Sequence, residues 1–438
     1  MICEYGTILS NKFVIMNKFD YRARLIDKKL DLYLSTFGAV CVEGPKWCGK
    51  TWTCTMHSKS EFMVGNPSGN FANRQLANLD VERALEGESP HLIDEWQEVP
   101  SIWDAVRASV DEKAEAGRYL LTGSATPQRK GVLHSGTGRI ARLAMHPMSL
   151  QECGRSECVV SLKDICKGND IDVKSIHSPE LEELIELVMR GGWPGGIDKS
   201  ATQALLIPKD YIENVIDIDM AKLDDIERDP VKVRKCLRSL ARNESTTAST
   251  NTIREDIAEF DDSSLSINTV TDYIGAFNRL FLLRDTKPFS TFLRSPVRIK
   301  QQAKRRFCDP SIAAALLNVT PRLLLRDLRT FGLLFESLVM RDLEIYAEAM
   351  GGELYHYQDY SGDDFDAVIQ TPDDGWSAFE IKLDPAQVDE AASTLVRIAA
   401  KFTHNPPTAL AVIVGKSGIA YRRKEDGVYV VPVTALCA

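Results

Sequence analysis

The sequence predicts an α/β protein with several domains, and three observations support this fold class. From Tyr21 to about Glu152, short apolar strands alternate with polar-faced helices. In the middle of the chain, two helical segments are followed by an apolar strand. From Phe331 to the last residue, a long helix precedes strands in which polar and apolar residues alternate. Strands separated by helices are typical of βαβ units and a parallel sheet, and 438 residues suit two to three domains.

The strands of the first domain are predicted at residues 38–42, 91–93 and 119–122, and residues 153–180 are predicted as a loop-rich insertion. The predicted boundaries are an N-terminal extension at 1–20, a parallel-sheet domain at 21–180, a helical region at 181–325 and a separate α/β domain at 326–438.

The helical region is predicted to contain a winged helix. Helices at 252–259 and 268–280, followed by a strand at 281–283, have the order of a winged helix-turn-helix. A glycine-rich stretch at 191–196 interrupts the helices before it, and the polar run at 243–247 indicates a linker or turn.

Composition narrows the classes of function. The formal net charge is −9, with 44% apolar and 26% charged residues, which describes an ordinary globular protein and excludes a generic polyanion binder. The sequence contains no run of eighteen apolar residues, so it predicts no membrane span. The ten cysteines form no C-x-x-C pair, which favours reduced thiols and a cytoplasmic protein.

A phosphate-binding loop is predicted directly after the first strand. The pattern G-x-x-x-x-G-K-[ST] lets backbone N–H groups face phosphates at the start of a helix. Lys50 is expected to bind the β- and γ-phosphates of ATP, and the Thr51 hydroxyl to bind Mg²⁺. The expected nucleotide-binding residues are Gly44, Pro45, Lys46, Trp47, Cys48, Gly49, Lys50, Thr51 and Trp52.

Two carboxylates are expected to complete this site. Asp94 follows the second strand and is predicted to hold Mg²⁺, while Glu95 is predicted to polarise the attacking water. Ser124, at the end of the third strand, is a candidate to sense the γ-phosphate, or else an ordinary turn residue. Arg139 is a candidate to stabilise the transition state, in the same chain or from a neighbouring subunit, although a surface role is the more common one.

Taken together, these motifs resemble a prokaryotic family of AAA+-type ATPases. The resemblance rests on residues 21–24, 43–51, 93–97 and 121–124, and continues through 191–194 and 335–338. It implies a P-loop ATPase fold and ATP binding. Because ATPases of this type often assemble into rings, a homo-oligomer is left open.

A local basic stretch is the main sign of a nucleic-acid partner. Residues 284–306 hold eight basic side chains against one acid, which suggests contacts with the phosphate backbone of DNA. The alternative is a solvated hairpin beside a winged helix that serves only for packing. The eight basic residues are Arg284, Lys287, Arg294, Arg298, Lys300, Lys304, Arg305 and Arg306.

The C-terminal domain holds a second group of candidate residues. Glu380 and Lys382 share one face of a predicted strand, and Asp366 is expected on the adjacent strand. With Glu336 on the preceding helix, the set resembles the core of PD-(D/E)xK nucleases, although no proline precedes Asp366. The resemblance implies Mg²⁺ ligands at Asp366, Glu380 and Glu336, with Asp366, Glu380 and Lys382 in catalysis. An active nuclease, an inactive nuclease-like binder and a plain surface strand all stay open.

The sequence therefore predicts an ATP-binding ATPase whose hydrolysis is coupled to the binding or processing of DNA. The alternative is a nucleotide-dependent switch that binds a protein partner and performs no chemistry on nucleic acid.

Overall fold

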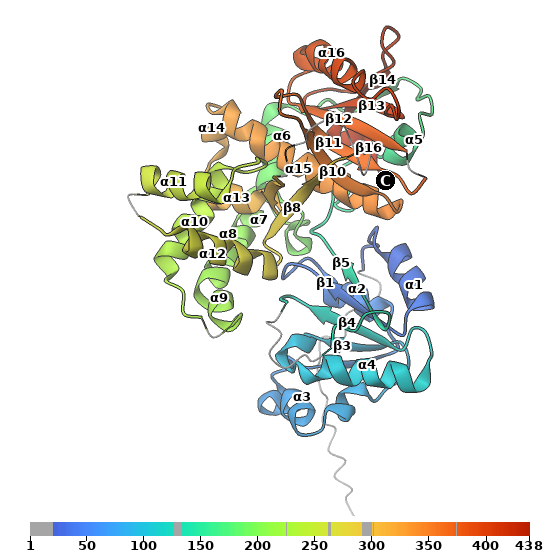
Figure 1. Ribbon diagram of the computed structural model, residues 1–438, viewed down its shortest axis with the longest axis vertical. Helices are drawn as coiled ribbons and strands as arrows, with labels where there is room; N and C mark the ends of the chain where they lie inside the picture. The colour runs from blue at the N-terminus through green and yellow to red at the C-terminus, as the bar shows by residue number, and fades with distance from the viewer. Residues whose placement is uncertain are drawn as a thin grey trace, which may run out of the picture.

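The protein is described by a computed structural model. It describes residues 21–126, 134–224, 226–261, 264–290, 300, 302–373 and 375–438. Figure 1 shows two bodies: one around an N-terminal sheet, and a larger one in which the middle helices lie beside the C-terminal strands. Within the described ranges, no helix has the length and apolar character needed to cross a membrane.

The N-terminal body is built on a five-stranded parallel sheet, as predicted. Its strand order is β2-β3-β4-β1-β5, and every neighbouring pair runs parallel. The strands are β1 (Ala39–Glu43), β2 (Ser60–Met63), β3 (His91–Asp94), β4 (Tyr119–Gly123) and β5 (Ile140–Ala144).

Helices cover both faces of this sheet, because alternate residues of a buried strand point to opposite sides. Val40 and Val42 pack with residues of α1 (Asp27–Thr36) and α2 (Lys50–Met56). Ala39 and Cys41 pack with the other helical layer. That layer holds α3 (Ser68–Leu79) and α4 (Ser101–Lys113).

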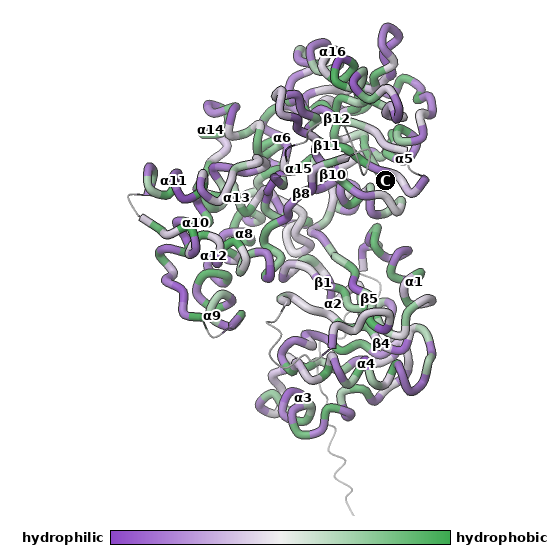
Figure 2. The backbone as a smooth tube through the Cα atoms, in the orientation of Figure 1, coloured by the Kyte–Doolittle hydropathy of each residue, from purple (hydrophilic) through white to green (hydrophobic). Residues whose placement is uncertain are grey.

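The middle region consists of short amphipathic helices, along which apolar and polar positions interleave (Figure 2). Gly191, with a φ of 68°, stands at the end of the first of them. The helices are α6 (Leu181–Arg190), α7 (Ala201–Ala204), α8 (Leu206–Asn214), α9 (Met220–Lys222), α10 (Pro230–Arg242), α11 (Thr250–Phe260), α12 (Ile267–Arg279), α13 (Pro310–Leu316) and α14 (Pro321–Leu324).

The predicted helix-helix-strand order is present. The side chains of Ser249 and Ser266 accept hydrogen bonds from the first turns of α11 and α12, which explains where these helices begin. An antiparallel hairpin follows, formed by β8 (Leu283–Pro288) and β9 (Lys304–Phe307). The strand therefore starts two residues later than predicted, and the assignment as a winged helix stays a prediction.

The C-terminal domain is organised around a nine-stranded mixed sheet of order β7-β14-β15-β13-β12-β11-β10-β8-β9. Helix α15 (Leu328–Ala349) packs against one face of it and α16 (Val388–Ala399) against the other. Its remaining strands are β7 (Lys174–Ser175), β10 (Glu353–Gln358), β11 (Asp364–Gln370), β12 (Trp376–Lys382), β13 (Ala409–Val414), β14 (Ile419–Arg422) and β15 (Tyr429–Pro432).

Strand pairing crosses the predicted domain boundaries at residues 180 and 325. Strand β7 pairs with β14, and β6 (Val160–Ser161) pairs with β16 (Leu436–Cys437). The segment 153–180, which also carries α5 (Leu162–Cys166), thus lies against the C-terminal domain instead of the N-terminal sheet. Hairpin β8–β9 joins the same sheet, because β8 pairs in parallel with β10.

The polar run at 243–247 contains a turn at 243–245, one of the two predicted alternatives, and it is not a linker. Glu244 and Ser245 are buried, with 1% and 3% of their surface exposed. The Glu244 carboxylate accepts hydrogen bonds from the backbone N–H of Phe307 and from the Ser337 hydroxyl. A short polar segment can be buried when its polar atoms are satisfied in this way, and here it ties β9 to α15.

Candidate functional site

The predicted phosphate loop lies between β1 and α2, at the carboxyl end of the parallel sheet. Gly49 adopts a φ of 105°, a conformation that favours glycine. A side chain at Gly44 would clash with the carbonyl oxygen of Met145, 2.2 Å from its Cβ position. Both glycines are therefore needed for the close backbone packing of the loop.

Lys50 is buried inside this loop, with 5% of its surface exposed. Its ammonium donates hydrogen bonds to the carbonyl oxygens of Gly44 and Pro45, at 3.0 and 2.8 Å. The loop backbone thus holds the positive charge at its centre, where phosphate groups of a nucleotide would lie.

The two predicted Mg²⁺ ligands lie side by side. The Thr51 hydroxyl donates to Asp94 Oδ1 at 2.8 Å, and the Thr122 hydroxyl donates to the same oxygen at 2.7 Å. Burial raises the pKa of Asp94, while the two hydroxyls favour its charged form. Thr122 is absent from the predicted site, although its place at the end of β4 is a signal that could have found it.

Glu95 lies next to this pair, at the start of the segment that follows β3. Its φ of 58° is unusual for a residue with a side chain, and its backbone N–H donates to the Thr122 hydroxyl at 2.9 Å. Its carboxylate accepts a hydrogen bond from the Ser124 hydroxyl at 2.8 Å and another from the Gln97 amide. Ser124 therefore positions the carboxylate, and Gln97 is a further member that the sequence did not single out.

Arg139 lies far from this group. Its carbonyl oxygen accepts from the backbone N–H of Ala39, at the beginning of β1, whereas the phosphate loop follows the end of β1. Its guanidinium pairs with Asp111 at 2.7 Å. A strand of five residues spans roughly 16 Å, so the predicted role toward nucleotide in the same chain is wrong; a role in a neighbouring subunit stays a prediction.

A pocket of about 430 Å³ opens beside the loop. Gly49 and Trp52 line one side of it, and Tyr21 lines it from the segment before α1. Pro194 and Gly195 of the glycine-rich segment also line the pocket. The segment is held in place by a backbone hydrogen bond from Met148 N–H to the Gly192 carbonyl, at 2.7 Å.

Two further contacts tie the loop to the rest of the molecule. Lys46 forms an ion pair of 2.5 Å with Asp219, a buried residue of the middle region. Arg24 donates to the carbonyl oxygen of Cys48 at 2.7 Å and pairs with Glu152 at 2.9 Å. Trp47, in contrast, is 60% exposed, and Cys48 is fully buried. No sequence spacing predicts the partner Asp219, because it lies 173 residues away.

The predicted C-terminal residues converge at the ends of β11 and β12. The Asp366 carboxylate accepts from the backbone N–H of Ile381 at 2.8 Å. Lys382 lies 2.8 Å from Glu380 and 4.0 Å from Asp366. Burial and the nearby Asp366 raise the pKa of Glu380 to about 8. The structure therefore brings Asp366, Glu380 and Lys382 together on one face, as expected.

A second lysine lies in this cluster. The Lys304 ammonium is 2.5 Å from Glu336 Oε1 and 3.6 Å from Asp366 Oδ1. The sequence placed Lys304 in the basic stretch and Glu336 among metal ligands, and did not predict that they would pair. We call Glu336, Asp366, Glu380, Lys304 and Lys382 the C-terminal cluster.

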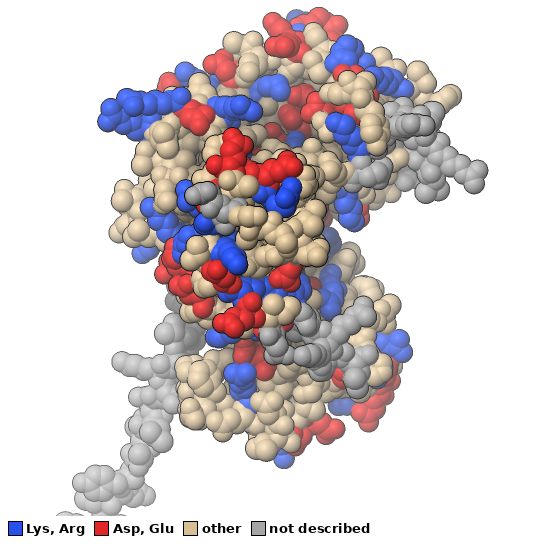
Figure 3. Space-filling view, turned by 60° about the vertical axis from the view of Figure 1, so that its left-hand side comes forward, with Lys and Arg blue, Asp and Glu red and all other residues tan. Residues whose placement is uncertain are grey.

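Three other described residues of the basic stretch are also paired inside the protein. Arg284 and the buried Arg306 both pair with Glu344, and Arg305 pairs with Asp285 at 2.7 Å. Arg294 and Arg298 lie outside the described residues. With Lys304, four of the six described basic residues of the stretch are therefore paired within the protein. The face drawn in Figure 3 accordingly shows basic and acidic side chains intermixed.

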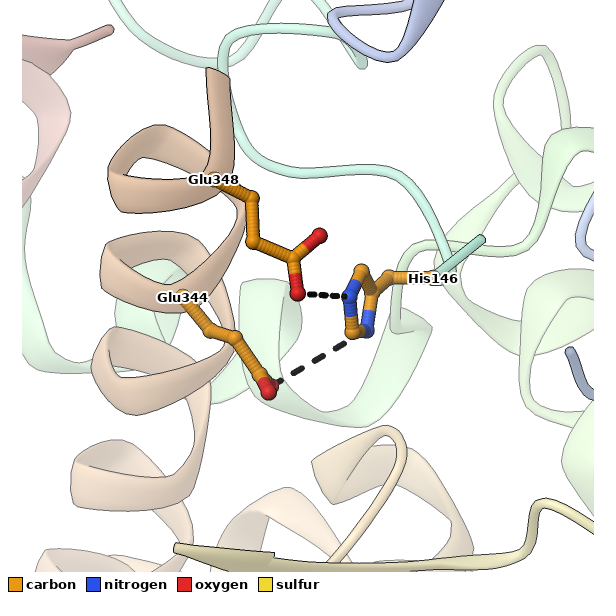
Figure 4. A group of neighbouring side chains, drawn as sticks. All are labelled: His146, Glu344 and Glu348. Carbon is orange, nitrogen blue, oxygen red and sulfur yellow. Dashed lines mark hydrogen bonds and ion pairs between the residues drawn. The ribbon is translucent and has the colours of Figure 1, made fainter. Parts of the chain in front are cut away.

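One other group joins the N-terminal body to α15. His146 points at Glu344 and Glu348, which lie one helical turn apart (Figure 4). Its ring nitrogens are 3.9 Å from Glu344 and 3.2 Å from Glu348. Arg284 approaches both glutamates and Arg306 pairs with Glu344, so two guanidinium groups balance the two carboxylates. We read this group as an ionic contact between the two bodies.

Comparisons with known proteins agree with the N-terminal assignment. Residues 36–154 match a family model described as an AAA domain. Residues 181–323 and 331–436 match models described as domains of unknown function (DUF8612 and DUF4143).

Relatives of the whole chain are distant. Two uncharacterised proteins, of Mycobacterium tuberculosis and Mycobacterium bovis, are each 23% identical over 349 residues, which cover 78% of this chain and 70% of theirs. A Walker-type ATPase of Pyrococcus abyssi is 14% identical with a TM-score of 0.41, covering 68% of this chain and 99% of its own. The ORC2 protein of Aeropyrum pernix is 13% identical with a TM-score of 0.30, covering 70% and 93%.

The AAA-domain match and the parallel sheet that carries the phosphate loop agree on one assignment: this chain contains a P-loop AAA-type ATPase domain.

Proposed function

We propose that the protein binds ATP with Mg²⁺ at the phosphate loop and hydrolyses its γ-phosphate, using Lys50, Thr51, Asp94 and Glu95. The observation that carries this proposal is the hydrogen-bonded chain from Thr51 through Asp94 and Thr122 to Glu95 and Ser124. It links the predicted metal side of the site to the predicted base.

The residues present fit a magnesium ion. Mg²⁺ prefers oxygen ligands and usually takes one or two from the protein, and the Thr51 hydroxyl and the Asp94 carboxylate are adjacent oxygen donors. A bound Mg²⁺ would neutralise phosphate charge. Lys50 would add a second positive charge from within the loop.

Glu95 is suited to orient and deprotonate the attacking water. A general base must have its carboxylate held toward the substrate, and here Ser124 and Gln97 both donate to the Glu95 carboxylate.

The 430 Å³ pocket beside Gly49 is the proposed site of the adenine base. It adjoins the loop that would hold the phosphates, and its lining combines Trp52 and Tyr21 with the backbone of the glycine-rich segment. Aromatic side chains offer flat surfaces on which a base can stack.

We further propose that hydrolysis is coupled to DNA binding, with a groove of about 760 Å³ between α1, β8 and β10 as the contact surface. Lys28, Lys29 and Lys287 line it. Among the described residues, none of the three has an ion-pair partner, and Lys29 lies over the Tyr33 ring, so all three ammonium groups are available to backbone phosphates. The internal pairing of Arg284, Lys304, Arg305 and Arg306 favours the alternative, a switch that binds a protein partner.

The rate of ATP hydrolysis with and without DNA tests both proposals. Wild type should hydrolyse ATP, Lys50→Ala should not, and DNA should raise the wild-type rate. A wild-type rate equal to that of Lys50→Ala would contradict the ATPase proposal. A wild-type rate that DNA leaves unchanged would favour the protein-partner switch. A cytoplasmic setting and a homo-oligomer remain part of the proposal and need separate measurements.

A further inference from the structure

The C-terminal cluster is a second place, separate from the ATPase site, where carboxylates could be expected to hold a divalent metal ion. A nuclease-like reading needs a divalent cation between carboxylates such as Asp366, Glu380 and Glu336. Oxygen ligands of Mg²⁺ lie at about 2.0–2.2 Å from the ion, so ligands of one ion must approach one another closely. Among the described residues, the only group of three or more candidate ligands within 4.8 Å of one another is that of His146, Glu344 and Glu348. Glu336, Asp366 and Glu380 do not form such a group.

A protein cation already lies between two of these carboxylates. The Lys304 ammonium is 2.5 Å from Glu336 Oε1 and 3.6 Å from Asp366 Oδ1. It also donates a hydrogen bond of 3.3 Å to the backbone carbonyl of Asp366. A metal ion that bridged Glu336 and Asp366 would have to occupy the space of this ammonium group.

Two ammonium groups face the three carboxylates of the cluster, and Asp364 is a fourth carboxylate nearby. Lys382 faces Glu380 and the second oxygen of Asp366, so Asp366 lies between two ammonium groups. Two fixed positive charges strongly disfavour a third, divalent charge a few ångströms away.

Lys304 is also held firmly by the fold. It is the first residue of β9, which pairs with β8, and β8 in turn pairs with β10 in the C-terminal sheet. Its side chain is only 12% exposed. The hairpin that follows the middle helices therefore inserts a cation into the neighbouring domain, and removing it would require two strands to separate.

We propose that Lys304 is the resident cation of the C-terminal cluster. The cluster then takes no divalent metal, and the C-terminal domain acts as a module that does not cleave nucleic acid and is locked to hairpin β8–β9. This inference does not depend on the proposed ATPase function. It predicts that removing the lysine charge turns a closed ionic cluster into a metal site.

The experiment measures Mn²⁺ binding, by calorimetry and electron paramagnetic resonance, to the full chain without nucleotide. Mn²⁺ suits oxygen ligands and is directly visible. The variants are wild type, Lys304→Met, Asp366→Asn and the double variant. Lys287→Met is the matched control, because Lys287 is an exposed lysine on the same hairpin. Binding that survives Asp366→Asn is assigned to other sites and subtracted.

Wild type and Lys287→Met should show no Mn²⁺ binding that depends on Asp366. Lys304→Met should gain a site at least about tenfold tighter than any such background, and the double variant should lose it. An unchanged site count in correctly folded Lys304→Met would overturn the claim that this lysine excludes the metal.

The wild type keeps the proposal falsifiable even if Lys304→Met fails to fold. Mn²⁺ binding by wild type that Asp366→Asn abolishes would overturn it. Cleavage of a supercoiled plasmid by wild type with Mg²⁺ or Mn²⁺, lost in Asp366→Asn, would overturn it equally.

Discussion

Replacing Glu95 with glutamine should separate ATP binding from ATP hydrolysis. The carboxylate of Glu95 is held by the Ser124 hydroxyl at 2.8 Å and by the Gln97 amide. An amide of the same shape keeps an oxygen that can accept a hydrogen bond, but it cannot take a proton from water. The phosphate contacts expected of Lys50 and the loop backbone are left in place.

The expected magnitudes differ for the two steps. A positioned general base contributes about 10²–10⁴-fold to a rate, so Glu95→Gln should raise the barrier to hydrolysis by about 3–5 kcal/mol. ATP affinity should change by less than about threefold. Lys50→Ala removes a charged donor worth about 1.5–3 kcal/mol, which corresponds to roughly 10- to 100-fold in affinity.

The assay pairs single-turnover hydrolysis with a titration of a fluorescent ATP analogue. Ser124→Ala is the graded control, because it removes one of the two side-chain donors to Glu95 and should slow hydrolysis by about tenfold. Hydrolysis by Glu95→Gln within about threefold of wild type would refute its role as the base. An equal loss of affinity in Glu95→Gln and Lys50→Ala would refute the separation of roles.

Three further predictions follow from single contacts. Asp219→Ala frees Lys46 for the nucleotide and should tighten ATP binding, measured by calorimetry, by about two- to fivefold. Weaker ATP binding by this variant would show that the ion pair does not withhold Lys46 from the nucleotide. Replacing Lys28 and Lys29 together with alanine should reduce the salt slope of DNA affinity, measured by anisotropy, by about 1.8 if both contact phosphates; an unchanged slope would remove them from the interface. Burial raises the pKa of Glu244 from its ordinary 4.5 to about 8, so the folded protein keeps a proton that the unfolded chain releases. The free energy of unfolding should therefore fall as the pH rises from about 5 to 8. Urea unfolding of Glu244→Gln at pH 5, 6.5 and 8 should show a smaller decrease in the free energy of unfolding with pH. An unchanged pH dependence would refute the assignment of the retained proton to Glu244.

Local patterns in the sequence predicted much of the fold. The strands β1, β3 and β4 lie within one residue of their predicted places, and α11 and α12 within two. These elements are visible because apolar periodicity and capping residues act over a few positions. The phosphate loop is local in the same sense, since its eight residues bend one backbone segment around one lysine.

The polar run at 243–247 and Arg139 show that local sequence patterns do not predict contacts between distant parts of the chain. Glu244 looks solvated in the sequence, but its partners Phe307 and Ser337 lie 63 and 93 residues away. The sequence offered Arg139 as a candidate to stabilise the transition state, beside the more common surface role. Its distance from the phosphate loop is set by the parallel register of β1 and β5, and the sequence does not contain that register.

The basic stretch shows most clearly what the sequence determined and what only the tertiary structure decided. The sequence alone establishes that positive charges gather before Phe307, but a charge has the same appearance whether it faces solvent or a buried carboxylate. Packing decided that Lys304 faces Glu336 and Asp366 and that Arg306 faces Glu344. The physical reason is that burying a charge is costly unless a partner is brought to it. Only the folded sheet places residues from distant parts of the chain, up to 62 positions apart, within that reach.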